Sequence, residues 1–597
     1  IYTGEDTLSL HDALPISKVL RYAFRVAETS FDPTQINDIY SRIVTGHIFE
    51  APYAYDPLSP TPLLLPLLAE SLPEVSDDFR QFTVRLRRGI FFADDPVFGG
   101  KPREFVAADL VYALQRLADP ANLSPLSETY LELRILGLAE AREAAIKGRK
   151  PFDYDQPLPG LTMPDAHTLV IRTAEARPRL AYLLADPTVA GAQAREVVQH
   201  YGERIGEHPV GTGPFRLKSW RRSSQIVLER NPGYRERFYE GHPGADDAEG
   251  QAILARFKGR RLPMVDEVEV SIVSESQPRW LGFLNGQVDC LAGQTGSVPG
   301  EFVPIAAPGG KLAPHLAKRG IQLQRRLNAD CAVVFFNMRD PVVGGYTPEQ
   351  VALRRAVSLA YDVGAEIRLA RRGQAVVAQS PVLPHCLGYD PHFKSEMGDH
   401  DPARAQALLD LYGFVDRNGD GWRERPDGSP LELVMNTETS QSDREYNELW
   451  RKAMHGVGIR IRFEPRQWTE NYKAAEAGTL QMWMLGLSAD QPDGADSLSH
   501  HYSKNIGSGN FAGFVLPAFD RLYERLQSMP DGPGREQVFR ECKRLAAAYM
   551  PYRTLVHRIS VNLMHPWLIG YRRPVFNVEW WHQVDLDARQ RAAMGKG

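Results

Sequence analysis

The sequence predicts a mixed α/β protein with more than one lobe. Runs with a hydrophobic period of two residues, typical of strands, alternate with runs of period about 3.6, typical of amphipathic helices. At 597 residues the chain is too long for one compact core. No unit repeats with a period of roughly 20 to 50 residues, so a solenoid or propeller is not expected. We therefore expect two or three lobes built from strands and helices.

Short alternating runs predict the strands. Phe82, Val84, Leu86 and Ile90 fall on one face of a run that turns at Gly89. The same alternation predicts strands within residues 19–27, 224–234, 264–273, 430–437 and 459–465. Residues 331–339 are almost wholly apolar, which predicts a strand buried on both faces.

Runs with helical spacing lie between these strands. Residues 103–120 carry an apolar stripe that ends at Pro120. Thr347 is placed to cap a helix over residues 348–361, with Gln350 in its first turn. A helix closed by Gly286 and followed by a strand is predicted within residues 277–292. Further amphipathic helices are predicted within residues 403–414, 446–458 and 515–529.

The composition excludes several classes of protein. With 43% hydrophobic and 24% charged residues, the chain has ordinary globular composition. Its net charge of −4 offers no broad basic field to a nucleic-acid backbone, so we expect no nucleic-acid partner. The longest apolar run, residues 61–72, is far shorter than the ~20 residues of a membrane-spanning helix.

The four cysteines show no pattern of a zinc knuckle or a disulfide-rich scaffold. Cys290, Cys331, Cys386 and Cys542 lie far apart and form no C-x-x-C pair. One or two bridges remain open, because the sequence does not give the connectivity.

The first 17 residues differ in character from the rest. They have neither the basic start nor the apolar stretch of a secretory signal. We expect residues 1–17 to be foreign to the fold or disordered.

A glycine-rich stretch at residues 208–220 invites comparison with phosphate-binding loops. Gly211 and Gly213 are followed by Pro214 and a strand-like run, whereas nucleotide loops need a further glycine or a Gly-Lys-Ser/Thr and a helix. We interpret the stretch as a tight turn whose glycines adopt backbone angles closed to other residues.

Residues 416–427 have the spacing of a calcium-binding loop. Asp416, Asn418 and Asp420 occupy oxygen-ligand positions, Gly421 the turn position, and Asp427 the twelfth position. The alternative is a polar hairpin turn held by its own side-chain to backbone bonds. The sequence leaves both open.

A histidine-rich loop is a second candidate metal site. His385, Cys386, His392 and His400 lie close in sequence, but no pair has the i, i+4 spacing of helical zinc ligands. No Gly-x-Ser-x-Gly elbow or Ser-x-x-Lys motif indicates nucleophilic catalysis.

An acidic loop follows the apolar run that contains Trp483. Asp490, Asp493 and Asp496 stand among proline and glycine residues there. Carboxylates at a strand end can pair with a ligand ammonium group where water is partly excluded. A solvated acidic loop is the alternative.

Six blocks of the chain stand in a characteristic order. They are FTVRLRRGIFF with FVAADLVYALQRL, PVGTGPFRL with LERNPGY, GQVDC, FFNMRD with LRRAVSLAYD, LSADQPDGAD, and NFAGF. The chain from about residue 24 to residue 577, which contains them, resembles the family 5 extracellular solute-binding proteins, the peptide- and nickel-type receptors of ABC importers.

The resemblance implies a periplasmic-binding-protein type II-like fold of two lobes and three domains that closes about a hinge. The expected boundaries are residues 18–56, 206–327 and 554–597 for a discontinuous domain I, 57–205 for domain II and 328–553 for domain III. The apolar strand at residues 332–339 would be one hinge crossing.

The resemblance also suggests ligand-binding residues. In peptide-binding members an aspartate of the acidic block pairs with the ligand's α-ammonium group, and Asp490 matches it here, with Pro492 and Asp493 continuing the block. Gln491 and Leu487 replace aromatic residues usual in the family, which leaves the ligand class open. Aromatic candidates near the cleft are Tyr40, Trp468, Trp483 and Phe511, each with core packing as the alternative.

The implied function is that of a monomeric periplasmic receptor without catalysis or cofactor. It would capture a peptide or peptide-like solute and deliver it to an ABC permease in the membrane. Other solutes remain open, namely haem, a nickel chelate, an opine or an oligosaccharide. An alternative of a different class is a metal-dependent hydrolase built on the histidines of residues 385–401.

Overall fold

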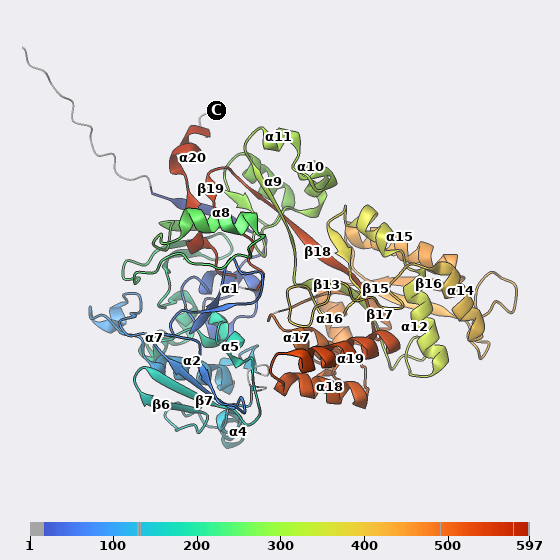
Figure 1. Ribbon diagram of the computed structural model, residues 1–597, viewed down its shortest axis with the longest axis horizontal. Coiled ribbons are helices and arrows are strands. Elements are labelled where there is room, and N and C mark those ends of the chain that lie inside the picture. The colour runs from blue at the N-terminus through green and yellow to red at the C-terminus, as the bar shows by residue number, and fades with distance from the viewer. Residues whose placement is uncertain (1–16, 128–130, 132, 490, 577, 595–597) are drawn as a thin grey trace, which may run out of the picture.

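The computed structural model describes residues 17–594 except 128–130, 132, 490 and 577. These residues form two bodies side by side, joined by few strands (Figure 1). We call residues 17–327 and 559–594 lobe 1, and residues 330–558 lobe 2. The structure confirms the predicted mixed α/β class, and residues 1–16 lie outside the described part of the chain.

The first layer of lobe 1 is a four-stranded sheet. Its order is β1 (Val19–Phe24), β10 (Glu267–Ile272), β9 (Gln225–Arg230) and β8 (Phe215–Arg221), with β1 parallel to β10 and the other pairs antiparallel. The helices of this part are α1 (Ile39–Thr45), α8 (Ala248–Phe257), α9 (Ser276–Leu284), α10 (Val303–Ala306), α11 (Pro314–Ala317) and α20 (Ala588–Met594). Two short pairs add β2 (Tyr53–Tyr55) with β3 (Leu64–Pro66), and β19 (Leu568–Ile569) with β20 (Asp585–Leu586).

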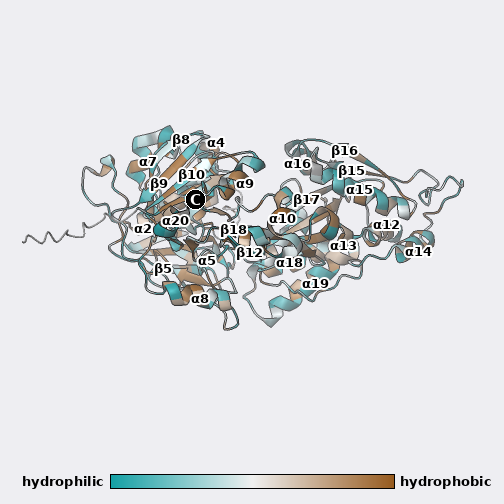
Figure 2. Cartoon of the chain, turned by 90° about the horizontal axis from the view of Figure 1, so that it is seen from above, coloured by the Kyte–Doolittle hydropathy of each residue, from teal (hydrophilic) through white to brown (hydrophobic). Residues whose placement is uncertain are grey.

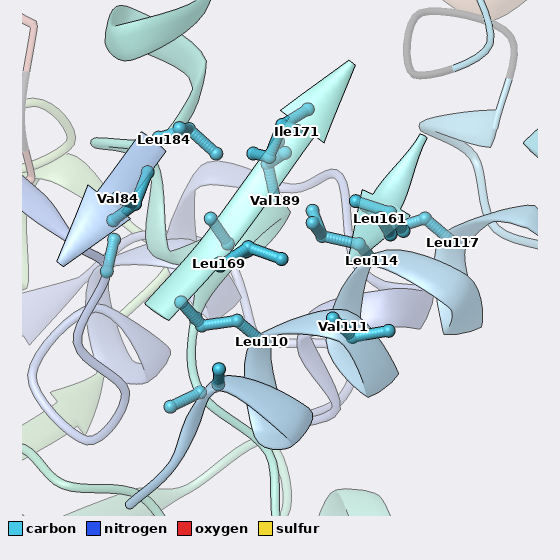
Figure 3. Close-up of a cluster of buried hydrophobic side chains, with 14 of the residues drawn as sticks. Val84, Leu110, Val111, Leu114, Leu117, Leu161, Leu169, Ile171, Leu184 and Val189 are labelled. Carbon is cyan, nitrogen blue, oxygen red and sulfur yellow. The ribbon is translucent and has the colours of Figure 1, made fainter. Parts of the chain in front are cut away.

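A second four-stranded sheet in lobe 1 is covered by α2 (Ala107–Ala118). Its order is β4 (Glu74–Val75), β5 (Gln81–Arg85), β7 (Thr168–Arg172) and β6 (Leu161–Asp165). Figure 3 shows Leu110, Leu114 and Leu117 of α2 facing Leu169 and other residues of this sheet, as the period of the helix predicts. Helices α4 (Leu138–Gly148), α5 (Leu180–Leu183), α6 (Pro187–Ala190) and α7 (Arg195–Tyr201) complete this part.

The eight-stranded sheet of the molecule forms the base of lobe 2, and part of it extends into lobe 1. The order is β11 (Cys290–Leu291), β18 (Tyr552–Met564), β13 (Asp330–Phe336), β17 (Met482–Ser488), β15 (Glu432–Thr437) and β16 (Arg460–Pro465), and β12 (Gln322–Leu327) and β14 (Ala375–Val377) also pair with β18. Every residue of β13 is buried, which confirms the strand predicted to be buried on both faces. The helices are α12 (Pro348–Ala360), α13 (Val363–Ala365), α14 (Pro402–Leu411), α15 (Gln441–Gly456), α16 (Trp468–Glu476), α17 (Gly494–Leu498), α18 (Pro517–Ser528) and α19 (Pro533–Tyr549).

The predicted helix signals are confirmed. Thr347 caps α12 by accepting from the Gln350 N–H, and Gln350 bonds back to Thr347, forming a capping box. The helix α9 ends before Gly286, whose φ is 69°, and β11 follows. Figure 2 shows the same two lobes from above, with hydrophilic residues on outer helices such as α14.

Two chain segments cross between the lobes, and both belong to one sheet. The strand β18 pairs with β13 and β14 in lobe 2 and then, from Ile559 onward, with β12 in lobe 1. The second crossing is Asn328–Ala329, which joins β12 to β13. It lies just before the apolar strand that the sequence suggested as the crossing, because β13 pairs along its length with β17 in lobe 2.

Hydrogen bonds tie the two crossings together. The Asn328 N–H donates to the Arg558 carbonyl oxygen at 2.9 Å. The Arg558 backbone N–H and Nε–H donate to the two carboxylate oxygens of Asp330, each at 3.0 Å. The crossings therefore bend as one unit, which is the condition for a hinge.

Separate hydrophobic cores lie in the two lobes. One core of lobe 1 gathers residues between 51 and 210, and others gather residues of the first sheet and of the C-terminal segment. The cores of lobe 2 draw on residues 331–556. The domain boundaries expected from the sequence stay predictions. All four cysteines are buried and free, so the bridges that the sequence left open are not formed.

The glycine-rich stretch is a close crossing of two backbones. A Cβ on Gly211 would lie 2.1 Å from the Ile48 carbonyl oxygen, and one on Gly213 would lie 2.6 Å from the His47 carbonyl oxygen. Neither glycine has a positive φ, so our interpretation from unusual backbone angles is wrong. Glycine is needed because the Gly213 N–H donates to the Ile48 oxygen at 2.8 Å, which leaves no room for a side chain.

We predict that Gly211→Ala destabilises the protein by about 2 kcal/mol or more, because a rigid backbone carbonyl occupies the space of the new methyl group. Thermal and urea unfolding followed by circular dichroism measure the effect. The matched control is Gly456→Ala, where no atom lies within 4 Å of the new Cβ. Equal stability of the two variants would contradict the close-crossing explanation.

Candidate ligand cleft

A large cavity lies between the lobes, over the hinge. Its volume is about 1420 Å³. Its floor consists of both crossings, residues 327–330 and 558–561, and its walls come from both lobes. A solute held there touches the parts of the molecule that move relative to one another.

The two walls come from different elements. Lobe 1 supplies Arg25 directly after β1, Arg42 in α1, Arg279 in α9, and the loop of residues 294–301. Lobe 2 supplies residues 370–372 and Gln374, the start of α15, and Ser488 at the end of β17 with Ala489 after it. These side chains are mostly polar, so the cleft suits a hydrated, polar solute.

Arginine dominates the charge of the cleft. Among its described lining residues are eight arginines and three carboxylates, although the whole chain has a net charge of −4. Five of the arginines pair with a carboxylate: Arg42 with Asp186 at 3.0 Å, Arg326 with Glu249 at 3.1 Å, Arg371 with Glu366 at 2.7 Å, Arg372 with Glu445 at 2.8 Å and Arg558 with Asp330 at 3.0 Å. These pairs neutralise most of the positive charge on the wall of lobe 2.

The remaining three arginines, Arg25, Arg279 and Arg573, all belong to lobe 1. Their described partners are neutral oxygens of hydroxyl, amide and carbonyl groups. Burial, and then the neighbouring Arg25, lower the pKa of Arg279 from its ordinary value. Burial and the charge of Arg572 lower the pKa of Arg326 in the same way. The wall of lobe 1 thus carries excess positive charge.

The acidic residue matched to the family's ligand-binding position, Asp490, lies outside the described residues. Ser488 and Ala489, just before it, line the cleft. Its role stays a prediction.

Asp493 takes part in a contact between the lobes. Its carboxylate accepts two hydrogen bonds from Arg535, at 2.7 and 2.8 Å, and one from the Ala495 N–H at 2.8 Å. Across the gap, Arg179 of lobe 1 places its Nε 2.8 Å from the same carboxylate. The expected ligand contact of Asp493 stays a prediction, and in the structure its oxygens are engaged by protein groups.

Arg179 also binds the end of a helix in lobe 2. Its guanidinium donates to the carbonyl oxygens of Leu526 at 2.7 Å, Gln527 at 2.9 Å and Met529 at 2.9 Å, at the C-terminus of α18. Helix C-termini carry partial negative charge and free carbonyl groups, so a guanidinium is a well-matched partner. We call Arg179 with Asp493 and these carbonyl groups the interlobe contact.

The aromatic candidates lie in different surroundings. Trp483 and Phe511 are 1% and 5% exposed and pack in a core of lobe 2. Trp468 is half-exposed, stacks on Tyr472, and does not line the cleft. Tyr40 is buried, and its hydroxyl oxygen accepts from the Nε–H of Arg25 at 2.8 Å. A ligand contact of these four residues stays a prediction, and Tyr40 is the one whose partner lines the cleft.

The calcium-type loop is folded as a compact turn. Asp416 accepts from the N–H groups of Gly419 and Gly421, at 2.7 and 2.8 Å, and Asn418 accepts from that of Asp420 at 2.8 Å. Potential ligand atoms of Asp416, Asp420 and Glu424 lie within 4.8 Å of one another. Asp427 instead accepts hydrogen bonds from Ser429. Calcium binding stays a prediction, with Glu424 a more suitable ligand than Asp427.

The histidine-rich stretch does not form a metal centre within the described residues. The Nε2 of His385 lies 2.9 Å from the Leu327 carbonyl oxygen, while Nδ1 of His400 lies 4.0 Å from Asp362. In the part of the chain that the structure describes, the calcium-type loop with Asp416, Asp420 and Glu424 is the one group whose side chains have metal-ligand spacing.

The sequence analysis missed the arginines of lobe 1. Arg25 follows β1 directly, and a charged residue at the end of a predicted strand is a signal that could have been used. Arg279 lies among apolar residues of α9, where an ionised side chain needs a special partner. A second hollow, of about 810 Å³, is lined only by lobe 1 residues such as Lys18, Trp567 and Arg591, so closure of the lobes does not enclose it.

The architecture and cleft agree with comparisons to known proteins. The family model described as bacterial extracellular solute-binding proteins, family 5 Middle, matches residues 64–509. The chain belongs to this family. Its resemblance to the family is thereby confirmed, and the hydrolase alternative is wrong, because the members are solute-binding proteins rather than enzymes.

Two curated relatives illustrate the family. The di/tripeptide-binding protein 2 of Pseudomonas aeruginosa (strain UCBPP-PA14) is 24% identical over 585 residues, which are 96% of this chain and 95% of that protein. The glutathione-binding protein GsiB of Escherichia coli O1:K1 / APEC is 29% identical over 386 residues, 65% of this chain and 60% of that protein.

Solved structures show the same fold. The periplasmic binding protein DppA from Helicobacter pylori, in complex with the peptide STSA, superposes with a TM-score of 0.69 at 20% identity, covering 96% of this chain and 98% of that one. The murein tripeptide binding protein MppA in its unliganded open form gives 0.69 at 19% identity, covering 96% and 98%. The periplasmic-binding-protein fold is thus confirmed. Within its described residues, the receptor has no helix with the length and apolar character needed to cross a bilayer.

We predict that Arg179→Ala opens the lobes and weakens solute binding roughly ten-fold or more, because the closed form loses charge-assisted hydrogen bonds that the open form lacks. Small-angle X-ray scattering gives the radius of gyration, and calorimetry with the solute that the protein carries gives the Kd.

The control for this substitution is Arg172→Ala. Among the described residues, the side chain of Arg172 donates to two lobe 1 partners, Gln81 at 3.0 Å and Thr162 at 3.0 Å. An unchanged radius of gyration and Kd in Arg179→Ala, or equal changes in both variants, would show that the interlobe contact does not stabilise the closed form.

The calcium interpretation predicts that EDTA lowers the melting temperature and that Asp416→Ala or Glu424→Gln removes this response, since a bound ion stabilises the folded state. Asp427→Asn is the control and should respond like the wild type. If EDTA leaves the melting temperature of the wild type unchanged, the loop is a turn without calcium.

Proposed function

We propose that this protein is the substrate-binding component of an ABC importer and takes a peptide or peptide-like solute. The observation that carries the proposal is the cleft of about 1420 Å³, formed by both lobes over the two hinge crossings. Family membership supports a solute-binding role.

Closure of the lobes couples binding to delivery. A solute on the hinge floor that also contacts both walls binds the closed form better than the open one, and so shifts the population toward closure. The permease would then recognise the closed form. We place the receptor in the periplasm as a monomer, as the resemblance to this family implies.

Two features support a peptide as the solute. The cleft exceeds the roughly 300 to 1,000 Å³ of small-molecule pockets, so it has room for several residues with water around their side chains. Relatives over most of the chain are a di/tripeptide-binding and a dipeptide-binding protein, and another is glutathione-binding. The sequence leaves haem, a nickel chelate, an opine or an oligosaccharide as other solutes.

Native mass spectrometry of the protein as purified tests the assignment. We expect a series of short peptide masses, released on denaturation. If no solute is carried, the spectra are repeated after incubation with a mixture of di- to pentapeptides. A single non-peptide mass, or failure to retain any peptide, would contradict the peptide assignment.

The expected role of Asp490 gives a sharper test. Asp490→Asn should weaken binding of a free tripeptide about ten-fold more than binding of its N-acetylated form, because the ligand ammonium group loses a charged partner. Calorimetry measures both. Equal losses for the two ligands would remove Asp490 from the ammonium site.

A further inference from the structure

The wall of lobe 1 carries positive charge that the protein does not neutralise. Arg25, Arg279 and Arg573 line the cleft, and the hydrogen-bond partners described for them are neutral oxygens rather than carboxylates. Two exposed carboxylates act on Arg279 through their charge without forming an ion pair, Glu301, which lines the cleft, and Glu275, which precedes α9. Two solvated carboxylates leave part of the charge of three guanidinium groups uncompensated.

Two of these arginines, Arg25 and Arg279, line the same cleft from neighbouring elements of lobe 1. After burial, the positive charge of Arg25 is the largest cause that lowers the pKa of Arg279. The hydroxyl of the buried Tyr40 orients Arg25 through its Nε. The Nη1 of Arg279 donates to the Val273 and Ser274 carbonyl oxygens at 2.7 and 2.6 Å, which fixes that guanidinium. Hydrogen bonds to other protein groups therefore fix the positions of both guanidinium groups.

Holding them there has an energetic cost. The exposed fraction of Arg279 is 8%, and like charges in a partly dry site repel more strongly than in water. Elsewhere in the cleft this cost is met by a carboxylate, as for Arg372 with Glu445. At Arg25 and Arg279 the missing anion can come from the solute.

We infer that the solute is anionic and that one of its carboxylate groups sits between Arg25 and Arg279 on the wall of lobe 1. The inference rests on the proposed function, whose solute class it narrows to acidic peptides and peptide-like acids. The carboxylate belongs to an acidic side chain, since a free C-terminus alone leaves a peptide without net negative charge. The planar guanidinium groups match its oxygens in geometry and charge.

Calorimetry with three peptide probes of equal size tests the inference and identifies the carboxylate. The probes are Ala-Glu-Ala amide, with a side-chain carboxylate only, Ala-Gln-Ala, with a C-terminal carboxylate only, and Ala-Gln-Ala amide, with neither. We expect Ala-Glu-Ala amide to bind at least about ten-fold more tightly than Ala-Gln-Ala amide. A gain for Ala-Gln-Ala alone would place the C-terminus at the arginines and contradict the inference.

The variants Arg25→Gln and Arg279→Gln should each reduce this preference roughly ten-fold and leave the Kd of the neutral probe nearly unchanged. Arg279→Lys keeps the charge and should retain part of the preference, which separates loss of charge from loss of structure. Circular dichroism verifies that each variant is folded.

The control is the double variant Arg372→Gln with Glu445→Gln on the opposite wall. It removes an existing ion pair, 2.8 Å apart, without changing the net charge of the cleft. We expect it to preserve the preference. Equal binding of all three probes by the wild type, or equal loss of all probes in the arginine variants, would overturn the inference.

A non-peptide pair separates this inference from the proposed function. Glutarate and its neutral diamide are titrated in parallel. If no peptide binds but glutarate does, and Arg25→Gln and Arg279→Gln abolish its binding, the peptide assignment fails and the anionic site stands. If the neutral peptide binds and an added carboxylate does not lower its Kd, the peptide assignment is supported and the anionic site is contradicted. Binding of none of the probes contradicts both.

Discussion

The structure depends on the pairing of two strand crossings in one sheet. Because β18 runs from lobe 2 into lobe 1 without a break, and Asn328–Ala329 crosses beside it, the lobes share a backbone hydrogen-bond ladder rather than a flexible linker. Such a ladder permits bending about one axis and resists sliding or separation. Asp330 strengthens the ladder at the bend, since both of its oxygens accept hydrogen bonds from Arg558. The ligand cleft lies on this hinge, so its shape is coupled to the angle between the lobes.

The arginines of the cleft fall into two groups, those that pair with a carboxylate and those that do not. Most arginines of the cleft are held by carboxylates, and these pairs fix the walls without attracting a solute. The exceptions line the cleft from lobe 1, where Arg25 follows β1, Arg279 lies in α9 after β10, and Arg573 follows β19. Elsewhere between the lobes, the interlobe contact joins the Arg179 guanidinium to a carboxylate and a helix C-terminus. The hinge sets how the lobes can move, and these charged groups set which arrangement is stable.

The strands and helices with strong periodicity could be predicted from the sequence, because local patterns record which side of an element is buried. β13 and the cap of α12 are examples. Helices α8, α16 and α19 were not predicted, although α19 has a periodic apolar face that a longer window could have found. The six family blocks identified the fold, since ordered motifs over most of the chain constrain far more than any one motif.

The sequence by itself determined the mixed α/β class, the family, and a binding role without catalysis. It did not determine which residues share a site, because neighbours in the cleft come from positions as far apart as Arg25, Arg279 and Ser488. Nor could it show that Asp493 meets Arg179 across the gap or that Trp483 is core, since the same residue types suit a ligand site or a packed interior. At Gly211 it gave the residue but not the reason, which is an approach to Ile48 from a distant segment. Those choices depend on contacts between remote parts of the chain, and only the tertiary structure makes them.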